Sequence, residues 1–431
     1  MITTEISATA LPVSLEDFRL KALAWAGQFP LVAYYNSNQI SYPYQGFEHF
    51  LAVSSGAVVP LVQEQLFESM REQLGRQQNM WCGYLSYDLK NQVEDLQSQN
   101  DDELDFPLAL LFEPEVRITF NHGSITIYTI DSYQEQIITA IAAFSTPTPA
   151  LSRPILMEQK VAPEAYMANV ERIRQHILEG DVYELNYCME FFARQIQVDP
   201  LPLFLSLNLK SPTPFAGFLK YHHKYLLCAS PERFLKRTGS KLISQPIKGT
   251  IRRGRTPEED ALLQEQLRHD EKELAENMMI MDLVRNDLRK SCATGTVKVE
   301  EMFGIYGFRQ VSQMITTVTG ELRAECDLVD ALKGAFPMGS MTGAPKIKAM
   351  EIIEQLESTK RGLFSGAFGY ITPSHDCDFN VVIRSLQYNA STGYLSLMVG
   401  SAITYDSDPQ REYEECLLKA KAMLQVLSAV L

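Results

Sequence analysis

The stretch SQPIKGTIRRG (residues 244–254) reads as the end of a β-strand, and a long helical pattern follows it almost at once. Apolar residues near one face of this pattern, over residues 257–288, are Leu262, Leu263, Leu267, Leu274, Met278, Met281 and Leu288. Their spacing predicts one long helix. A strand that leads directly into a helix indicates a fold that mixes the two kinds of element.

Outward from this stretch, the same mixture continues toward the C-terminus. We expect a helix over residues 165–180 that ends on Gly180, and a last helix that Asp408 caps before Pro409. Apolar runs between them predict strands. They are YELNYCMEFFA (183–193), FAGFLKY (215–221), YLLCAS (225–230), VSQMITTVTGEL (311–322), SGAFGYI (365–371), DFNVVIRSLQYN (378–389) and YLSLMVGSAIT (394–404).

The first part of the chain is richer in strands. Short apolar segments such as LVAYY (31–35), WCGYLSYDL (81–89) and ITIYTI (125–130) are separated by polar or glycine turns. The segment FSTPTPALSRPILMEQKVA (144–162) holds three prolines, which favours a surface connection. We therefore divide the chain into an N-terminal region, 1–155, and a second domain, 156–431.

Composition limits the partners of the protein. The chain has 431 residues, 45% of them hydrophobic, and a formal net charge of -14, which argues against nucleic acid and anionic membranes as partners. Its seven cysteines are scattered without metal-ligand spacing. We find no apolar run long enough for a membrane span and no signal-peptide pattern, so we expect a cytoplasmic protein with free thiols.

Two helical segments each carry a pair of glutamates three residues apart. These are Glu273 with Glu276, and Glu412 with Glu415. Carboxylates at this spacing face the same way, and two such pairs can surround Mg²⁺. Exposed helices are also rich in glutamate, and Lys272 lies four residues from Glu276. Spacing alone leaves both interpretations open.

Two further stretches suggest chemistry. In GSMTGAPKIKAMEIIEQLE (339–357) a glycine turn runs into a helix, which suits either an anion site or an ordinary helix start. Lys248 lies one strand after SPERF (230–234). An isolated lysine usually extends to solvent, but burial would lower its pKa and leave a nucleophilic amine, with Glu232 as a nearby acid.

The order of these motifs resembles one enzyme family. SPERFL, PIKGTIRRG, DEKELAENMMIMDLVRNDL, AFPMGSMTGAPK, FSGAFGY, DFNVVIRSL and DSDPQREYEECLLKAKAML succeed one another as in the chorismate-utilising enzymes. The resemblance is dense over about residues 160–431 and looser at PYQGFEHFLA and WCGYLSYDL. It implies an α+β fold in which two large, mostly antiparallel sheets pack face to face with helices outside.

The resemblance also implies roles for individual residues. Glu273, Glu276, Glu412 and Glu415 match the Mg²⁺ ligands that bind the ring carboxylate of chorismate, and Lys248 and Glu232 match catalytic positions. Arg384 and the Gly400 backbone match groups that receive the enolpyruvyl carboxylate. The remaining substrate-binding positions are Gly249, Thr250, Ser340, Gly343, Ala344, Lys346 and Lys419.

Lys248 favours one branch of the family. Anthranilate, isochorismate and salicylate enzymes typically have Pro-Ile-Ala-Gly-Thr where this chain has Pro-Ile-Lys-Gly-Thr, and in this lysine the chain resembles many aminodeoxychorismate synthases. There the amine is thought to form a covalent adduct with chorismate that ammonia then displaces. Gln313, at a common histidine position, argues against pyruvate loss and hence against anthranilate, and Asn277 points the same way.

Two departures from the family pattern remain. Glu184 stands where the enzymes that add water carry lysine and those that add ammonia usually carry glutamine, so this chain departs from both patterns. Phe364 replaces a frequent tyrosine.

The resemblance implies a partner that supplies ammonia. No cysteine lies in a glutaminase-like setting, so we expect a separate glutamine amidotransferase subunit, in the branch toward p-aminobenzoate and folate. The alternatives are component I of anthranilate synthase and a catalytically silent, chorismate-binding regulatory subunit.

Overall fold

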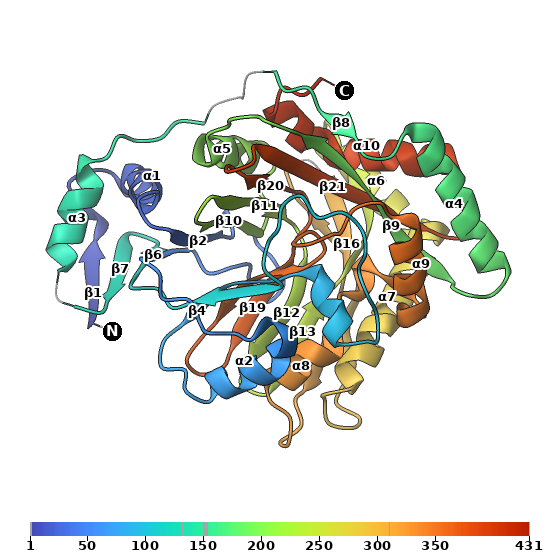
Figure 1. Ribbon diagram of the computed structural model, residues 1–431, viewed down its shortest axis with the longest axis horizontal. Helices are drawn as coiled ribbons and strands as arrows, with labels where there is room; N and C mark the ends of the chain where they lie inside the picture. Colours follow the sequence, from blue (N-terminus) through green and yellow to red (C-terminus); the bar gives the residue numbers. More distant parts are fainter. Residues whose placement is uncertain (1, 132, 150–153, 310, 431) are drawn as a thin grey trace.

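The computed structural model describes residues 2–131, 133–149, 154–309 and 311–430. Two large sheets face one another, every strand pairing within them is antiparallel, and helices cover the outer faces (Figure 1). This confirms the predicted α+β architecture.

The larger sheet has twelve strands in the order β1-β7-β6-β3-β2-β10-β11-β20-β21-β9-β17, with β8 paired to β9. Their bounds are β1 Ile2–Ser7, β2 Leu31–Asn36, β3 Phe50–Ser54, β6 Val116–Asn121, β7 Ser124–Thr129, β8 Glu158–Gln159, β9 Glu184–Ala193, β10 Phe215–Tyr221, β11 Lys224–Ser230, β17 Gly343–Ala344, β20 Ser385–Asn389 and β21 Tyr394–Ile403.

The smaller sheet has nine strands in the order β14-β16-β13-β12-β19-β18-β4-β5, with β15 paired to β16. Their bounds are β4 Trp81–Leu85, β5 Ala109–Phe112, β12 Arg233–Thr238, β13 Lys241–Gln245, β14 Ile247–Arg252, β15 Lys298–Gly307, β16 Val311–Glu321, β18 Ala367–Ile371 and β19 Cys377–Val381.

The α-helices are α1 Leu15–Ala26, α2 Leu66–Leu74, α3 Gln134–Ala143, α4 Pro163–Leu178, α5 Pro200–Lys210, α6 Pro257–Arg268, α7 Glu271–Arg289, α8 Leu328–Ala335, α9 Lys346–Leu356 and α10 Pro409–Val426. Short 3-10 helices are η1 Ala8–Ala10, η2 Gln63–Gln65, η3 Tyr87–Gln92 and η4 Gly339–Met341. Within the described ranges, no helix is both long and apolar enough to cross a bilayer.

Alternation of side chains along the strands builds three apolar cores. In β2, Val32 and Tyr34 pack toward the helices outside the larger sheet, whereas Ala33 and Tyr35 point into the core between the sheets. There the Tyr35 ring stacks on Phe368 of β18, with ring centroids 4.6 Å apart. A third core joins the smaller sheet to α2, α7 and α8. The central strands of both sheets, such as β2, β4 and β18, are therefore buried on both faces, which explains their continuous apolar runs.

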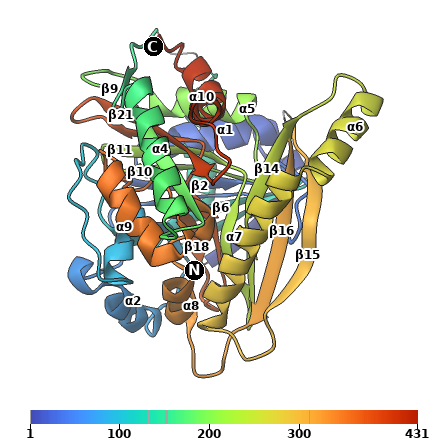
Figure 2. The ribbon, with the colours of Figure 1, turned by 90° about the vertical axis from the view of Figure 1, so that its right-hand side faces the viewer.

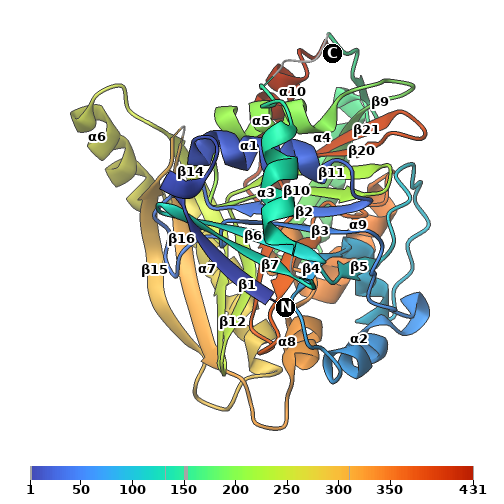
Figure 3. The same ribbon diagram turned by 90° about the vertical axis from the view of Figure 1, so that its left-hand side faces the viewer.

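The two parts of the chain share both sheets. In the larger sheet β2 pairs with β10, and in the smaller sheet β4 pairs with β18. Each sheet therefore consists of one block of strands from before residue 155 and one block from after it, joined by a single strand pairing, and residues 150–153 of the predicted connection lie outside the described residues. The predicted boundary near residue 155 therefore does not separate two independent cores, because residues from both sides of it pack in the same cores. Figure 3 shows the edge formed by β1, β7 and α3.

Two elements that the sequence predicted as continuous are each divided in the structure. The helix expected over residues 257–288 is two helices, because Asp270 interrupts the pattern and caps α7 by accepting a hydrogen bond from the Glu273 backbone N–H at 3.1 Å. Leu262 and Met278 are exposed, so they do not share the buried face. The separate helix α6 projects from the body (Figure 2). The strand expected over residues 378–389 is also two strands, β19 and β20, which belong to different sheets.

Candidate active site

Two crossings between the sheets lie side by side and carry two of the predicted site residues. The chain passes from β11 to β12 through Glu232, and from β19 back to β20 through Arg384. The backbone N–H of Val381 donates to the Glu232 carbonyl at 3.0 Å, and that of Ala229 donates to the Arg384 carbonyl at 3.2 Å. These bonds bring the carboxyl and the guanidinium to the same edge of the facing sheets.

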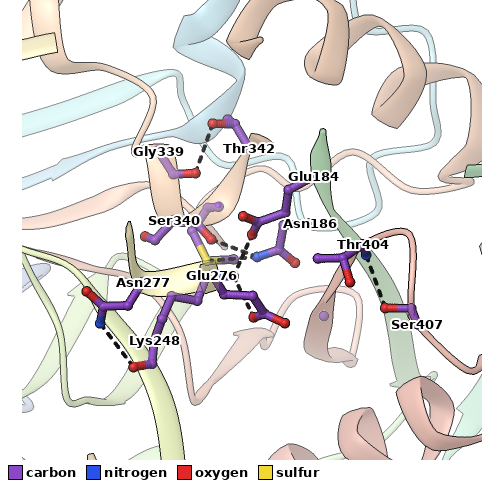
Figure 4. A network of polar contacts seen from close by, with 12 residues as sticks. Glu184, Asn186, Lys248, Glu276, Asn277, Gly339, Ser340, Thr342, Thr404 and Ser407 are labelled. Atoms are coloured by element: carbon purple, nitrogen blue, oxygen red, sulfur yellow. Dashed lines mark hydrogen bonds and ion pairs between the residues drawn. The ribbon is translucent and has the colours of Figure 1, made fainter. Parts of the chain in front are cut away.

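Lys248 is the second residue of strand β14, which Pro246 separates from β13. Asn277 of α7 donates from Nδ2 to the Lys248 carbonyl at 3.2 Å, so α7 fixes the backbone of this strand. The Lys248 ammonium lies 2.7 Å from Oε1 of Glu184, the first residue of β9, and 3.8 Å from Oε2 of Glu276 (Figure 4). One amine therefore joins the two sheets and α7.

The expected pKa of Lys248 is wrong in its direction. Burial does disfavour the charged amine, but the carboxylates of Glu184 and Glu276 outweigh it and raise the pKa of Lys248 above its usual value. The resting lysine is therefore an ammonium ion. It needs a proton acceptor before it can act as a nucleophile.

Glu232 has the opposite character. It is buried, and burial raises its pKa to about 7, although the Ser340 side chain and the Lys248 charge oppose the shift. Both Glu232 and Ser340 line a small cavity with Met338 and Val284. A carboxyl that still holds its proton near neutral pH is suited to act as a general acid.

The glycine turn lies against β9 and so reaches the same place. Ala344 pairs with Glu184 in the β17–β9 ladder, and a Cβ on Gly343 would lie 2.2 Å from the Glu184 carbonyl oxygen. Asn186 donates from Nδ2 to the Ser340 carbonyl at 2.9 Å. Only a glycine permits this close approach of the turn to the strand.

Lys346 follows directly after the predicted turn, but its ammonium already has an ion-pair partner and a hydrogen-bond acceptor within the protein. Its ammonium contacts Oδ2 of Asp287 at 2.5 Å and the carbonyl oxygen of Pro337 at 2.7 Å. This buried pair ties the turn to α7. Lys346 thus supports the turn and offers no free charge to a ligand.

Arg384 contrasts with Lys346. It is partly buried, and its guanidinium has no hydrogen-bond or ion-pair partner among the described residues. Burial lowers its pKa. Its backbone has a φ of 52°, a left-handed conformation that side chains rarely adopt. An unpaired guanidinium at this crossing suits a carboxylate ligand.

Gly400 and Lys419 are joined across β21 and α10. The Lys419 ammonium donates to the Gly400 carbonyl at 2.8 Å and pairs with Glu415 at 2.7 Å. A Cβ on Gly400 would lie 2.5 Å from Cys188 Sγ. Thr250 is exposed and accepts a bond at 3.4 Å from Gln313 Nε2.

The four predicted metal ligands come from α7 and α10, which the fold brings together. Lys272 links the helices, with its Nζ 3.7 Å from Oε1 of Glu276 and 3.4 Å from Oε1 of Glu412. Across the described ranges, three ligand atoms within 4.8 Å of one another are provided by His176, Glu179 and Asp181, and not by the four glutamates. The side chains of the four glutamates therefore lie in the same region, but in the described structure their oxygens are not as close together as the ligands of a bound metal ion would be.

The chemistry of these carboxylates fits a hard cation. Burial and the charges of Glu276 and Glu415 raise the pKa of Glu273 to about 7. Oε2 of Glu412 is buried and has no hydrogen-bond partner in the described chain, while Ser407 donates to Oε1 at 2.7 Å. Crowded carboxylates and a buried oxygen without a donor are features that Mg²⁺ would satisfy.

Sequence reasoning missed Asp287 and the pairing of Lys272 with Glu412, which hold the site together. Asp287 and Lys272 act on Lys346 and the glutamates from different turns of α7. Their signal in the sequence is helical spacing from Glu276, but nothing in the spacing shows which partner each one meets. Such pairs depend on tertiary contacts.

Comparisons with known proteins agree with this geometry. A family described as chorismate binding enzyme matches residues 30–425. The chain is 34% identical over 360 residues to aminodeoxychorismate synthase component 1 of Bacillus subtilis (strain 168), covering 80% of this chain and 76% of that one. Other relatives of similar identity are named anthranilate synthase component 1.

Two further comparisons extend the range. A rice protein (Oryza sativa subsp. japonica) named "Probable aminodeoxychorismate synthase, chloroplastic" is 42% identical over 267 residues, which is 61% of this chain but only 30% of the rice protein. Anthranilate synthase component I from Streptococcus pneumoniae TIGR4 superposes with a TM-score of 0.76 at 26% identity, covering 89% of this chain and 93% of that one.

Proposed function

Because the chain belongs to the family of chorismate binding enzymes, we propose that it aminates chorismate to 4-amino-4-deoxychorismate as component I of an aminodeoxychorismate synthase. The observation that carries this proposal is Lys248, an amine held 2.7 Å from Glu184 on a strand beside Glu232 and the α7 glutamates. An amine in this position can act as a nucleophile toward the ring.

Lys248 and Glu232 have separate roles in the first substitution, as nucleophile and as general acid. The Lys248 ammonium first gives one proton to water. The neutral amine then attacks C2, the ring double bonds shift, and the C4–O bond breaks. Glu232 gives its proton to the departing hydroxyl, which leaves as water, and its raised pKa supports this role. Ammonia then forms the C4–N bond while the C2–N bond to Lys248 breaks. One hard displacement becomes two easier ones.

Charged groups around the ring would orient the substrate. We propose that Glu273, Glu276, Glu412 and Glu415 hold Mg²⁺, which would supply positive charge for the ring carboxylate. The unpaired guanidinium of Arg384 would bind the enolpyruvyl carboxylate in a bidentate manner. Retention of pyruvate is supported by Gln313, because an amide does not exchange protons near neutral pH.

The nitrogen would come from a partner. Names such as component 1 among the relatives imply a second subunit for those proteins. We propose a separate glutamine amidotransferase for this chain, replaceable by ammonium salts in vitro.

Product analysis tests the proposal directly. Purified protein is incubated with chorismate, Mg²⁺ and ammonium, and products are resolved by mass, with an EDTA control. We expect an amine that retains the enolpyruvyl group and forms only with Mg²⁺. Lys248→Ala should abolish the covalent adduct, whereas Lys298→Ala, at an exposed lysine of β15, should behave as wild type.

Other products would change the assignment. Anthranilate with free pyruvate would favour anthranilate synthase component I, a name that several relatives bear. No turnover with any nucleophile would favour a silent chorismate-binding subunit.

A further inference from the structure

We propose that Glu184 is the position at which ammonium binds and gives up a proton before its nitrogen attacks the substrate. This inference rests on the proposed function and assigns the step that the lysine chemistry leaves open. It concerns a residue that the resemblance to other chorismate enzymes does not explain.

The two carboxylate oxygens of Glu184 have different surroundings. Oε1 accepts from the Lys248 ammonium at 2.7 Å. Oε2 is buried and has no hydrogen-bond donor in the described chain. A buried oxygen without a donor is costly, so such an atom calls for an explanation. Beside an amine that must be displaced from carbon, this oxygen is suited to receive an N–H of the incoming nitrogen.

The backbone holds this carboxylate in place from both sides. Glu184 pairs with Ala344 on one side, and its neighbour Leu185 pairs with Ile403 of β21 on the other. Gly343 packs so closely that a Cβ there would lie 2.2 Å from the Glu184 carbonyl. The carboxylate is therefore supported by a fixed strand rather than a loop, which favours a defined geometry toward the reacting atoms.

Carboxylate chemistry gives this position a function that glutamine or lysine cannot perform. An anion attracts ammonium, which is the main form of the nucleophile at neutral pH, whereas an amide has no charge and cannot accept the proton. A lysine there would repel ammonium. Glu184 thus selects a nitrogen cation and converts it to the reactive base.

The protons balance when water carries the proton of Lys248, which gives one proton to water before it attacks and takes one back when it leaves as a neutral amine. Ammonium transfers one proton to Glu184, and the lone pair of the resulting ammonia forms the C4–N bond as the C2–N bond to Lys248 breaks. The product amine keeps the remaining three protons as an ammonium group. Glu232 has lost one proton to the departing water, and transfer of the proton from Glu184 to Glu232 restores the enzyme.

The test compares two nucleophiles in Glu184→Gln. Ammonium must lose a proton to react, whereas hydroxylamine is largely unprotonated at neutral pH. We expect kcat/KM for ammonium to fall by about 100-fold at pH 7, the usual scale for losing a proton acceptor, and that for hydroxylamine by about threefold or less. Raising the pH increases the concentration of free ammonia. The loss of kcat/KM for ammonium in Glu184→Gln, relative to wild type, should therefore become smaller.

Controls separate this role from others. Glu179→Gln changes an exposed carboxylate just before β9 and should leave both rates unchanged. Glu184→Asp keeps the negative charge and should keep the preference for ammonium. This variant tests the proposal independently if Glu184→Gln folds poorly. Equal losses with both nucleophiles would overturn the proposal by reducing Glu184 to a holder of Lys248, and no loss would overturn it as well. Wild-type protein that aminates with neither nucleophile would instead refute the proposed function.

Discussion

The Nζ atom of Lys272 on α7 lies 3.4 Å from Oε1 of Glu412 on α10, and this ion pair joins the two helices that carry the paired glutamates. The same Nζ lies 3.7 Å from Oε1 of Glu276. The lysine thus places a positive charge among carboxylates that we propose as Mg²⁺ ligands. Any cation that binds there competes with it.

Removal of this lysine charge should strengthen metal binding. In Lys272→Met we expect the Mg²⁺ concentration for half-maximal activity to fall about fivefold, the scale of a partly exposed charge pair of about 1 kcal/mol. Lys421→Met, at an exposed lysine of α10, is the control. A higher Mg²⁺ requirement in Lys272→Met would contradict the competition.

Metal affinity should depend on pH through Glu273. Its pKa of about 7 means that a proton occupies this carboxylate in acid and must leave before a cation binds. We therefore expect the Mg²⁺ dissociation constant, measured by calorimetry, to rise as the pH falls from 8 to 6. Glu273→Gln should bind Mg²⁺ weakly at every pH, and a steep pH dependence retained in this variant would assign the effect to another group.

Activity and stability should both respond to Glu232. Because its pKa is raised from 4.5 to about 7, the general acid is lost as the pH rises through 7, and kcat should fall there. Ionisation is also easier in the unfolded chain, so this group lowers the free energy of unfolding progressively between those two values.

Glu232→Gln isolates both effects. It should reduce kcat by about 10²- to 10⁴-fold and remove the alkaline limb of the profile. In urea unfolding, the difference between variant and wild type should favour the variant more at pH 8 than at pH 5. Wild-type behaviour in both assays would mean that another group is the acid.

Arg384 should affect substrate binding more than folding. Its guanidinium has no hydrogen-bond or ion-pair partner in the described chain and feels the Glu415 charge only at longer range, so Arg384→Gln should cost the fold little. We expect the KM for chorismate to rise about 10- to 100-fold, the worth of a charge-assisted contact, with little change in melting temperature. Arg289→Gln, at an exposed arginine of α7, is the control. A large loss of stability would indicate a structural role.

Two glycines with positive φ angles allow the cost of backbone strain to be distinguished from the cost of steric crowding. Gly249 has a φ of 94°, and a Cβ there would lie 3.2 Å from the Met314 Cβ and 3.4 Å from Glu273 Oε2. Gly239 has a φ of 61° and open space around it. Gly239→Ala should cost about 1 kcal/mol of stability without loss of activity. Gly249→Ala should cost more and reduce turnover at least tenfold, and equal effects in both variants would contradict this.

The sequence predicted the elements of this fold better than their junctions. The apolar run at 215–221 is β10 with the predicted bounds, and Asp408 caps α10 by accepting from the Arg411 N–H at 2.9 Å. These features depend on local periodicity and hydrogen bonding. The division of residues 378–389 between two sheets depends on the unusual backbone of Arg384, which no local preference indicates.

The candidate site shows the same limit. The resemblance picked residues that the fold gathers at one edge of the facing sheets, but it did not reveal that Glu184 meets Lys248 across 64 positions of the chain. The expected pKa of Lys248 was wrong for that reason. Burial was foreseeable, whereas the carboxylates that reverse its effect belong to other elements.

The pairing of early strands with late ones has a consequence for how the enzyme folds during synthesis. β2 and β4 leave the ribosome long before β10 and β18, their partners in the two sheets. The early strands must therefore wait for distant ones, which makes folding slow and leaves unpaired edges exposed during synthesis. Glu232 and Arg384 lie at crossings between these sheets, so the enzyme cannot become active until nearly the whole chain has been translated.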